Sequence, residues 1–166
     1  LIVRDPYSDY PIMSTLVSSV LGRTDADVLA WDTYVLSSPI TSGYHLSGWR
    51  RVIEEAFGHR TYYLVAQEEN KTVQGIVPLV FLASRGFGRF MVSLPFVNYG
   101  GLIANSSEAY RLLEVSAIQK ARDLHAAHIE LRHERPIETS WVSAERKVSM
   151  RLSLPGSYEL LVKGFP

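Results

Sequence analysis

The sequence predicts an α/β domain (α+β in its element order) in which helices flank a mixed β-sheet, and two observations support this fold class. Apolar residues at helical spacing and short runs rich in β-branched and aromatic residues follow one another, in the order helix, helix, strands, helix, strand and strand. The chain has 166 residues, of which 46% are hydrophobic and 20% charged. A chain of this size and composition can bury one sizeable core.

Residues 1–26 are expected to form a segment of strand and loop. Leu1–Val3 has the character of a short strand, whereas Arg4–Arg23 contains prolines and serines and is expected to be a loop with one short helix. Thr24 then caps a helix, with Asp27 in the reciprocal capping-box position. The buried side and the end of this helix are marked by Val28, Trp31, Val35 and Ser37-Ser38-Pro39.

The next helix is the clearest in the chain, because its apolar residues fall at i, i+3, i+4, i+7 and i+8 without a break. Gly58 stands where a C-terminal cap belongs. We expect the aromatic residues of this stripe to lie in the core rather than to contact a ligand. The stripe consists of Trp49, Val52, Ile53, Ala56 and Phe57.

Three strands are expected to follow, over Thr61–Gln67, Thr72–Leu82 and Phe90–Leu94, with a glycine-rich turn at Arg85–Arg89. The second strand is almost wholly apolar, which is typical of a strand covered on both faces. Pro78 interrupts it. Because proline cannot donate a hydrogen bond to a neighbouring strand, we expect a bulge or a sheet edge at this residue.

The second half of the chain continues with an extended segment, a helix and two more strands. Asn98–Ala104 is expected to be extended, and Asn105 is expected to cap a helix that ends near Leu124, with Glu108 in the reciprocal position. The last two expected strands are His128–His133 and Lys147–Leu154.

Charge and composition exclude several classes of function. Lys and Arg number 17, as do Asp and Glu, so the whole chain has no general attraction to DNA, RNA or an anionic membrane, although a local basic patch is compatible with this balance. The longest apolar run, Gly75–Ala83, is too short to cross a bilayer. The sequence contains no cysteine and does not open with a secretory leader, and a cytoplasmic location is therefore expected.

Common catalytic motifs are absent from the sequence. It has no serine nucleophile elbow, no zinc-protease motif and no dinucleotide fingerprint. The turn at residues 85–92 looks like an RNA-recognition strand, but Phe87 and Phe90 are three residues apart and would point to opposite faces. The sequence therefore names no catalytic base and predicts no RNA binding.

Tyr99, Gly100 and Gly101 form the loop best suited to contact a ligand. Two adjacent glycines permit positive φ angles and let a ligand approach the backbone closely, and Tyr99 adds a hydroxyl group and a flat ring. The alternative is a tight turn or bulge that joins two strands, and the residues alone favour the two interpretations equally.

Polar residues near the end of the expected sheet supply further candidates. His128, Glu130 and Arg132 share one face of a strand, where they either form a solvated ion pair or line a cleft. His45 precedes a helix and is expected to be exposed enough to meet a substrate. A metal site is not expected, because the strand would place His133 on the opposite face from His128 and Glu130.

Several short motifs together resemble a known family. In order and spacing they are similar to the N-terminal half of FemAB-like proteins, in particular the branch associated with exosortase/PEP-CTERM exopolysaccharide systems. The resemblance covers residues from Asp27 to Phe165. The motifs are Tyr44-His45, Gly48-Trp49, Val52-Ile53, Phe57-Gly58-His59, Gly75-Ile76-Val77-Pro78-Leu79, Ser93-Leu94-Pro95-Phe96, Tyr99-Gly100-Gly101, Ile129-Glu130-Leu131-Arg132, Lys147-Val148-Ser149-Met150 and Leu154-Pro155.

The resemblance implies two GNAT-like (acyl-CoA N-acyltransferase fold) domains in tandem. Residues 27–156 would form the first, and residues 157–166 would begin a truncated helix that leads to the second. Fem transferases move an amino acid from aminoacyl-tRNA to the peptide of a cell-wall precursor, and their first domain largely provides the precursor site. The implied partners are a cell-envelope precursor or another small amine acceptor, and the second domain of the same chain.

The sequence lacks the glycine-rich loop with which GNAT domains bind CoA. GNAT domains that use CoA carry a glycine-rich loop before a helix, whose amides bind the pyrophosphate. Here no glycine follows Gly101 before the expected helix, and Glu108 places negative charge where a phosphate would lie. We therefore expect no cofactor in this domain, with acyl-CoA or aminoacyl-tRNA as the donor of the intact protein, and no activity of this part alone.

The sequence thus leads to one main hypothesis and two alternatives. The main hypothesis is the substrate-binding half of an N-acyl or aminoacyl transferase that acts on a peptidoglycan- or exopolysaccharide-related acceptor. The alternatives are a stand-alone CoA-dependent acetyltransferase and a non-catalytic glycan- or peptide-binding module. The expected acceptor contacts are the Tyr99-Gly100-Gly101 loop and the polar pair Glu130 and Arg132, with His45 and Arg51 as weaker contacts for an anionic group.

Overall fold

The computed structural model describes residues 16–84, 86–135, 137, 141–144, 150, 152 and 154–164. Within them a mixed six-stranded sheet has the order β1-β2-β3-β4-β6, and β5 pairs with β3 beyond the end of β4. All of the pairs are antiparallel except β4 with β6, which run parallel. The strands are β1 (Val17–Val20), β2 (Arg60–Gln67), β3 (Val73–Ser84), β4 (Gly88–Ser93), β5 (Ile103–Ala104) and β6 (Ile129–Glu130).

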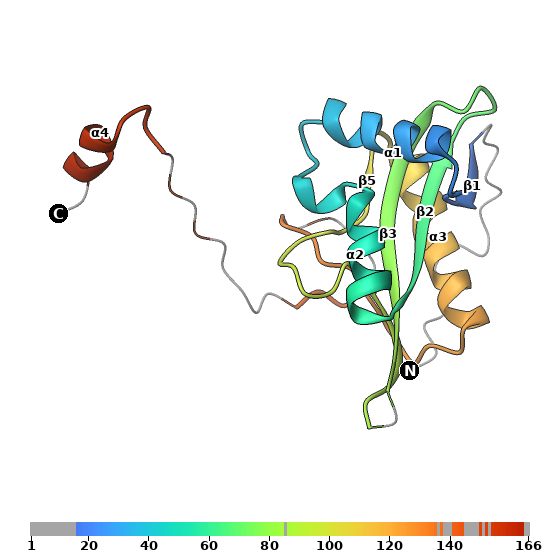
Figure 1. The fold of residues 1–166 in the computed structure, drawn as a ribbon. Coiled ribbons are helices and arrows are strands. Elements are labelled where there is room, and N and C mark those ends of the chain that lie inside the picture. Colours follow the sequence, from blue (N-terminus) through green and yellow to red (C-terminus); the bar gives the residue numbers. More distant parts are fainter. Residues whose placement is uncertain are drawn as a thin grey trace.

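Helices cover both faces of this sheet, and the predicted fold class is confirmed (Figure 1). On one face α3 packs over the largest cluster of buried apolar residues, which contains Leu64, Leu79 and Leu113. On the other face α1 packs over Tyr63 and Ile76, and α2 packs over Val80. The helices are α1 (Asp25–Ser37), the 3-10 turn η1 (Gly43–His45), α2 (Gly48–Phe57), α3 (Ser107–Asp123) and α4 (Tyr158–Lys163).

The predicted caps of the first two helices are confirmed. The side chain of Thr24 accepts a hydrogen bond from the Asp27 N–H, and the Asp27 carboxylate accepts one from the Thr24 N–H. Gly58 ends α2 in the left-handed conformation, with φ 66°. Such local signals depend only on neighbouring residues, which is why the sequence predicts them well.

The apolar stripe of α2 is less buried than expected. Ile53 is fully buried, but Trp49 is half-buried and Phe57 is 46% exposed, so the prediction that Phe57 lies in the core is wrong. The Phe57 ring instead stacks on the exposed ring of Phe96, with their centroids 4.3 Å apart.

The region before Thr24 contains a strand where a loop with a short helix was expected. β1 pairs with β2 from Val17↔Gln67 to Val20↔Leu64, and so continues the sheet at its edge. The serines of β1 weaken its strand signal, and pairing with the strongly apolar β2 decides its conformation. The strand expected over Leu1–Val3 lies outside the described residues.

Pro78 causes no bulge, but the expected sheet edge is present on the side of β3 that faces β4, because the pairing of these two strands ends at Leu79↔Ser93. On the other side Pro78 pairs with Tyr63 of β2 in an unbroken register, and the register shift between β2 and β3 lies at Ala66/Gln67. The Pro78 carbonyl accepts the N–H of Leu94 at 3.0 Å, just beyond the end of β4. The backbone nitrogen and the carbonyl of one residue point to the same side of a strand, so the Pro78 nitrogen also faces the β4 side. Because β4 has already ended there, the missing N–H of proline costs the sheet no hydrogen bond.

Three elements of the second half differ in length or position from the prediction. Within the expected extended segment Asn98–Ala104 only Ile103–Ala104 forms a strand. Within the expected strand His128–His133 only Ile129–Glu130 does so. Ser106, not Asn105, caps α3, because the Ser106 side chain accepts the Ala109 N–H. Asn105 instead joins the Tyr34 hydroxyl to the Gln74 side chain.

The last part of the chain contains a short helix and no described strand. The strand expected over Lys147–Leu154 lies partly outside the described residues. The three described positions, Met150, Leu152 and Leu154, are exposed and do not belong to a strand. The helix expected from Ser157 is present as α4, and none of its residues is buried. In the part of the chain that the structure describes, no helix is long and apolar enough to span a membrane.

Candidate functional site

The candidate site lies where the parallel strands β4 and β6 end. The pairing of the two strands ends at Val92↔Glu130, and the crevice at the carboxyl ends of parallel strands is a common place for ligands to bind. Here the protein closes the crevice with its own chain. The Arg132 N–H donates to the Ser93 hydroxyl at 2.7 Å, and the Gly100 N–H donates to the Arg132 carbonyl at 3.1 Å.

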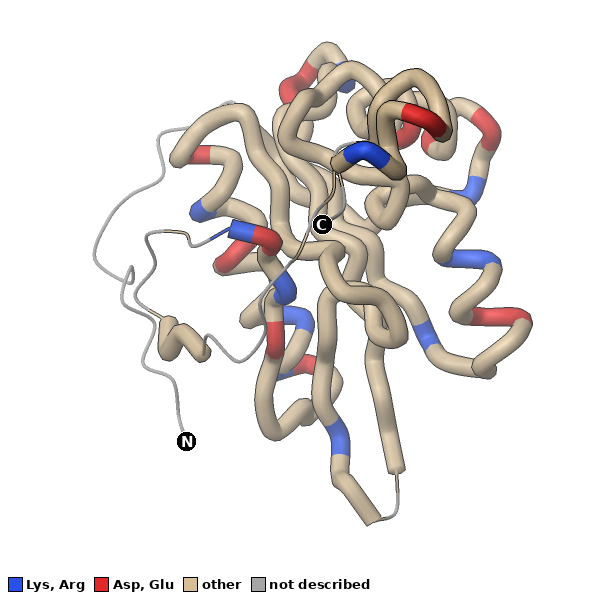
Figure 2. The backbone as a smooth tube through the Cα atoms, turned by 90° about the vertical axis from the view of Figure 1, so that its left-hand side faces the viewer, with Lys and Arg blue, Asp and Glu red and all other residues tan. Residues whose placement is uncertain are grey.

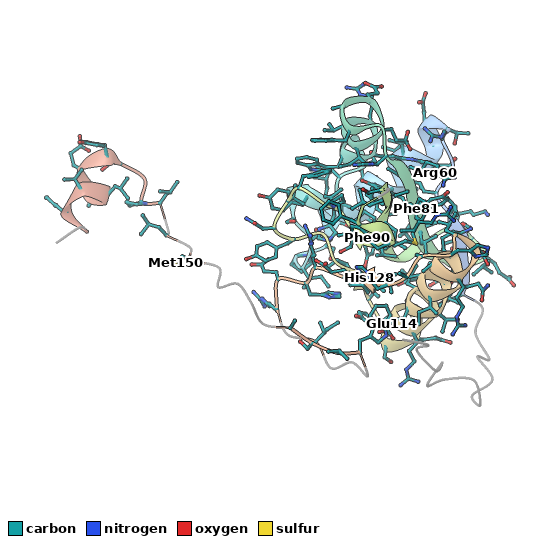
Figure 3. All side chains as sticks on the ribbon, turned by 90° about the horizontal axis from the view of Figure 1, so that it is seen from below. Arg60, Phe81, Phe90, Glu114, His128 and Met150 are labelled. Atoms are coloured by element: carbon teal, nitrogen blue, oxygen red, sulfur yellow. The ribbon has the colours of Figure 1, made fainter. Side chains whose placement is uncertain are left out.

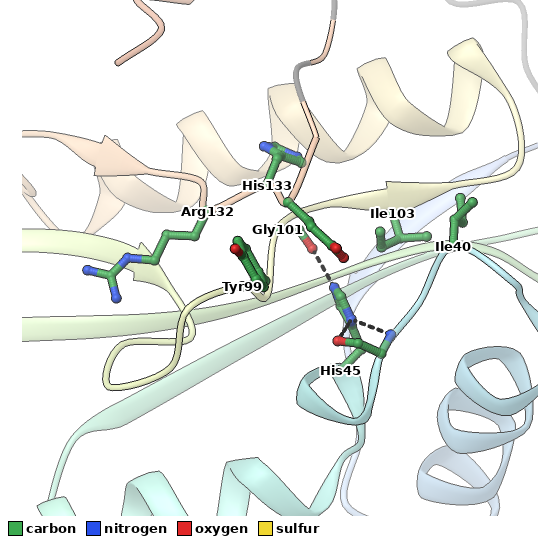
Figure 4. Close-up of a pocket in the computed structure, with 9 residues that line it drawn as sticks. Ile40, His45, Tyr99, Gly101, Ile103, Arg132 and His133 are labelled. Atoms are coloured by element: carbon green, nitrogen blue, oxygen red, sulfur yellow. Dashed lines mark hydrogen bonds between the residues drawn. The ribbon is translucent and has the colours of Figure 1, made fainter. Parts of the chain in front are cut away.

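A small pocket of about 30 Å³ opens beside this closure (Figure 4). It brings together four residues that the sequence analysis singled out, His45, Tyr99, Gly101 and Arg132. The volume suffices for about one water molecule or a group of similar size. An entire acceptor molecule would therefore have to lie outside the pocket and extend only a small group into it.

Close packing explains why glycines occupy positions 100 and 101. Neither has a positive φ angle, contrary to the expectation from the sequence. A Cβ atom at Gly100 would lie 2.7 Å from the Leu94 Cβ, and one at Gly101 would lie 2.6 Å from the His133 ring and 2.9 Å from the Arg132 carbonyl oxygen. The close approach that the glycines permit is therefore made by the protein itself.

Positive φ angles occur earlier in the same loop, at residues with side chains. Leu94 has φ 45° and Phe96 has φ 70°. The left-handed region is unfavourable for bulky residues, so the surrounding contacts must hold this loop in place. Leu94 is fully buried, and the Phe96 ring lies between its neighbours Phe57 and His59 at centroid distances of 4.3 and 5.9 Å.

His45 is buried, and the expectation that it is exposed to a substrate is wrong. Only 4% of the surface of His45 is exposed, because η1 turns the ring inward toward the Tyr99-Gly100-Gly101 loop. The Nδ1 atom accepts the Ser42 N–H at 3.2 Å, and the Nε2 atom lies 3.1 Å from the Gly101 carbonyl oxygen. These partners fix the neutral tautomer that carries its proton on Nε2.

Burial lowers the pKa of His45, although its backbone hydrogen bonds to Gly101 and Ser42 oppose this shift. The imidazole is therefore neutral, and both of its nitrogen atoms are engaged at neutral pH. A general base needs a free lone pair near the reacting amine. In this arrangement His45 positions the backbone of Gly101 and has no lone pair to offer.

His133 is a second histidine that packs against the same loop, and it is partly buried. Burial lowers its pKa to about 4, a hydrogen bond with the Leu102 backbone opposes the shift, and His45 contributes to it. Its ring lies near the Tyr110 hydroxyl, with 3.5 Å between the oxygen and Nε2. The sequence pattern marked His133 only as a member of a metal-like cluster, and nothing in its spacing revealed this packing role.

The predicted polar pair Glu130 and Arg132 forms an ion pair. The Arg132 Nε lies 2.7 Å from a Glu130 carboxylate oxygen, and the two side chains are 30% and 50% exposed. Arg132 also donates to the Val97 carbonyl at 3.3 Å. Figure 4 shows that its guanidinium group points away from His45. Arg132 and the half-buried Tyr99 thus form the rim of the pocket, whereas Glu130 does not line it and pairs with Arg132 beside it.

Arg51 lies away from this site. It belongs to α2, its side chain is 80% exposed, and its nearest charged partner is Glu55 at 4.0 Å. The remaining lining of the pocket comes from residues that the sequence did not indicate as substrate contacts, namely Ile40, Ser42, Ile103, His133 and Glu134. Ser42 carried a usable signal, because a serine three residues before His45 can form a capping box with it.

The histidines near β6 do not gather into a metal site. His125 contacts the Arg122 carbonyl through Nδ1, and His128 stacks on Phe90 with centroids 4.9 Å apart. Among the residues that the structure describes, no group of three or more histidine or acidic side chains could hold a metal ion.

A second, open hollow of about 270 Å³ lies near the start of β2. Two of its charged side chains pair with each other, because Arg23 donates two hydrogen bonds to the Glu54 carboxylate at 3.0 and 2.9 Å. Although partial burial opposes it, the hydrogen bonds from Arg23 and Thr61 lower the pKa of Glu54. This hollow is wider than the first pocket, and of its lining residues Arg23 and Glu54 are already paired with each other.

Comparison with known proteins gives a match in fold alone. No protein-family model matches the sequence, and no curated protein matches it. The structure of a GNAT family acetyltransferase from Staphylococcus aureus is similar, with a TM-score of 0.55 and 10% identity over 84% of this chain and 100% of that one. The aminoglycoside 6'-N-acetyltransferase AAC(6')-Ih from Acinetobacter baumannii has a TM-score of 0.46 and 11% identity, with the same coverage. Together with the strand order described above, the first match shows that this chain has the GNAT fold.

Proposed function

We propose that this chain is the acceptor-binding half of a FemAB-like N-acyl or aminoacyl transferase. Its acceptor would be an amine of a cell-envelope precursor, related to peptidoglycan or to the exopolysaccharide systems associated with PEP-CTERM proteins. The donor, acyl-CoA or aminoacyl-tRNA, would be bound by another part of the intact protein.

The observation that carries this proposal is the closed crevice between β4 and β6. Arg132 uses its N–H and its carbonyl to bond Ser93 and Gly100, so no free backbone groups remain at that residue for a cofactor to pair with. The start of α3 also lacks the glycine-rich loop of CoA-binding domains. Its first turn carries Glu108, which would repel a pyrophosphate group.

The transfer reaction requires positioning more than it requires reactive side chains. The amine nitrogen attacks the carbonyl carbon of the donor, backbone amides stabilise the oxyanion, and one base removes the amine proton. In this half, we assign Tyr99 and Arg132 to acceptor contacts at the rim, with Glu130 beside them. We assign His45 to holding the Gly101 backbone, and we assign no catalytic base.

A stand-alone acetyltransferase is the second candidate, and the fold comparison favours it. The chain covers the full length of a solved structure that is described as a GNAT family acetyltransferase. In that case the Tyr99-Gly100-Gly101 loop would have to separate from Arg132 so that CoA could enter.

Calorimetry with acetyl-CoA distinguishes the two candidates. We expect no binding in the micromolar range, because the crevice is occupied by the chain itself. Clear micromolar binding would overturn the proposal in favour of the stand-alone enzyme.

A second experiment tests the acceptor site itself. We expect Tyr99→Ala and Arg132→Ala to weaken binding of a soluble peptidoglycan-precursor glycopeptide, whereas Arg51→Ala, on exposed α2, should leave it unchanged. Equal binding by all three variants would contradict the assignment of the rim. A transfer assay with the complete protein separates a transferase from a non-catalytic binding module.

A further inference from the structure

The hairpin between β3 and β4 projects from the body of the protein and has no role in the site described above. The last pair between β2 and β3 is Arg60↔Phe81, so Leu82–Ser84 pair only with residues of β4. Figure 1 shows this two-stranded tip extending beyond the rest of the sheet. A two-stranded hairpin gains little stability in water, which makes a projecting tip with an exposed ring unusual.

Phe87 occupies this tip and is 87% exposed, more than any other aromatic side chain among the described residues. Gly86 and Gly88 stand on either side of it, and a Cβ atom at either glycine would meet no other atom within 4 Å. The ring therefore has no packing partner within the described part of the chain.

The base of the hairpin is well ordered by contacts, in contrast to its tip. The Arg89 carbonyl accepts the Ala127 N–H at 2.7 Å, and the Phe90 ring stacks on the His128 ring. Figure 3 shows Phe90 and His128 side by side at this end of the molecule. These contacts hold the base of the hairpin against the body of the protein, so that the tip with Phe87 projects from it.

The charged side chains of the hairpin are all basic. Between Lys71 and Glu108 the sequence contains no aspartate or glutamate. Figure 2 shows a basic residue and no acidic residue on the projecting hairpin. In the described part of the chain, no ion pair engages Arg89 or Arg60.

Arg89 and Arg60 also project from the same face of the sheet. Arg89 pairs with Ala83, Arg60 pairs with Phe81, and Ala83 and Phe81 are two residues apart on one strand. The Arg60 guanidinium lies over the Phe81 ring, 4.9 Å from its centroid, and remains exposed. Two cations on one face thus accompany an aromatic ring at the tip.

From this arrangement we propose that the β3–β4 hairpin docks the protein on an anionic membrane surface. Phe87 enters the interface between headgroups and acyl chains, while Arg89 and Arg60 bind lipid phosphates. A bilayer fits this feature better than a protein partner does. A stable protein interface needs about 800 Å² on each partner, which a convex tip with one ring does not offer. The inference does not depend on the proposed transferase function.

Sedimentation with lipid vesicles tests the proposal in the whole chain. We expect binding to vesicles of phosphatidylcholine mixed with phosphatidylglycerol, and much weaker binding to phosphatidylcholine alone. Phe87→Ser should reduce the affinity about tenfold or more, because it removes the buried ring. Arg89→Gln should reduce it about fivefold, and only toward the anionic vesicles. Leu36→Ser and Arg51→Gln, which change exposed residues on α1 and α2, are matched controls without an expected effect.

A site-specific probe measures insertion directly. The chain has no cysteine, so Gly86→Cys can be labelled with a polarity-sensitive fluorophore while Phe87 stays in place. We expect its emission to shift to the blue with anionic vesicles, and no shift for Gly43→Cys on η1. The proposal is overturned if wild-type protein does not bind anionic vesicles at low salt, or if Phe87→Ser binds as well as wild type. It is equally overturned if Phe87→Ser alters only the oligomeric state, because the hairpin would then contact a second copy.

Discussion

The α3 face of the sheet and the crevice between β4 and β6 are both buried, but different interactions hold them together. On the α3 face, apolar side chains such as Leu113, Leu79 and Ala117 fill the space between helix and strands. In the crevice, glycine backbone, a serine hydroxyl and two neutral histidines do so. The first kind of packing tolerates apolar substitutions that conserve volume, whereas the second depends on single close contacts and on the protonation state of two rings.

Truncating a side chain on the α3 face should have the largest effect on stability. Leu113 is fully buried, and Leu113→Ala should lower the free energy of unfolding by about 3 kcal/mol, since it leaves a cavity between α3 and β3. Urea denaturation measures this loss. Leu36→Ala, at a residue that is 78% exposed, is the control with little expected change, and similar values for both variants would contradict the assigned core.

Adding one methyl group in the crevice should have the next largest effect. Gly101→Ala places a Cβ atom 2.9 Å from the Arg132 carbonyl oxygen, which is backbone and cannot turn aside. We expect a loss of about 2 kcal/mol in the free energy of unfolding. Gly43→Ala, whose new methyl group would meet nothing within 4 Å, serves as the matched control. A Gly101→Ala protein as stable as Gly43→Ala would show that the crevice is not closed as described.

The sequence predicts the helical face far better than the crevice. The physical reason is the separation along the chain of the residues that interact. The capping box of Thr24 and the left-handed Gly58 depend on residues within one turn, so their pattern is visible in the chain. The spacing of Leu113, Ala117 and Ala121 likewise follows from helical geometry alone.

The crevice, in contrast, depends on residues far apart in the sequence. Gly101 was recognised, but as a residue with conformational freedom, and its true constraint is the ring of His133. The sequence indicates an exposed loop residue at His45, because nothing local shows that η1 turns it inward. Only the pairing of β4 with β6 reveals that Arg132 lies beside Ser93.

Lowering the pH should weaken the crevice while the α3 face stays intact. The folded-state pKa of His133 lies below its unfolded value of 6.5, at about 4. The unfolded chain therefore binds more protons in this range. Stability is complete above about pH 6.5 and is lost progressively as the pH falls toward 4.

We expect His133 alone to contribute about 1 kcal/mol of this loss between about pH 6.5 and about pH 5.5, and His45 to add to it in the same direction. Urea denaturation at several pH values measures the slope. His133→Gln should flatten it, whereas Leu113→Ala should keep the wild-type slope at lower overall stability. An unchanged slope in His133→Gln would mean that the ring is not buried as described.

The smallest effect is expected at the capping box of α1, which belongs to neither region. Thr24→Ala removes the acceptor for the Asp27 N–H and should cost about 0.5 to 1 kcal/mol, because water can replace the lost hydrogen bond at this exposed site. Thr24→Ser keeps the hydroxyl and should restore stability, and thermal unfolding of the three proteins makes the comparison. An exposed hydrogen bond is thus worth less than the close contacts at the buried Gly101. A loss at Thr24 as large as that of Gly101→Ala would remove this distinction between the exposed cap and the buried crevice.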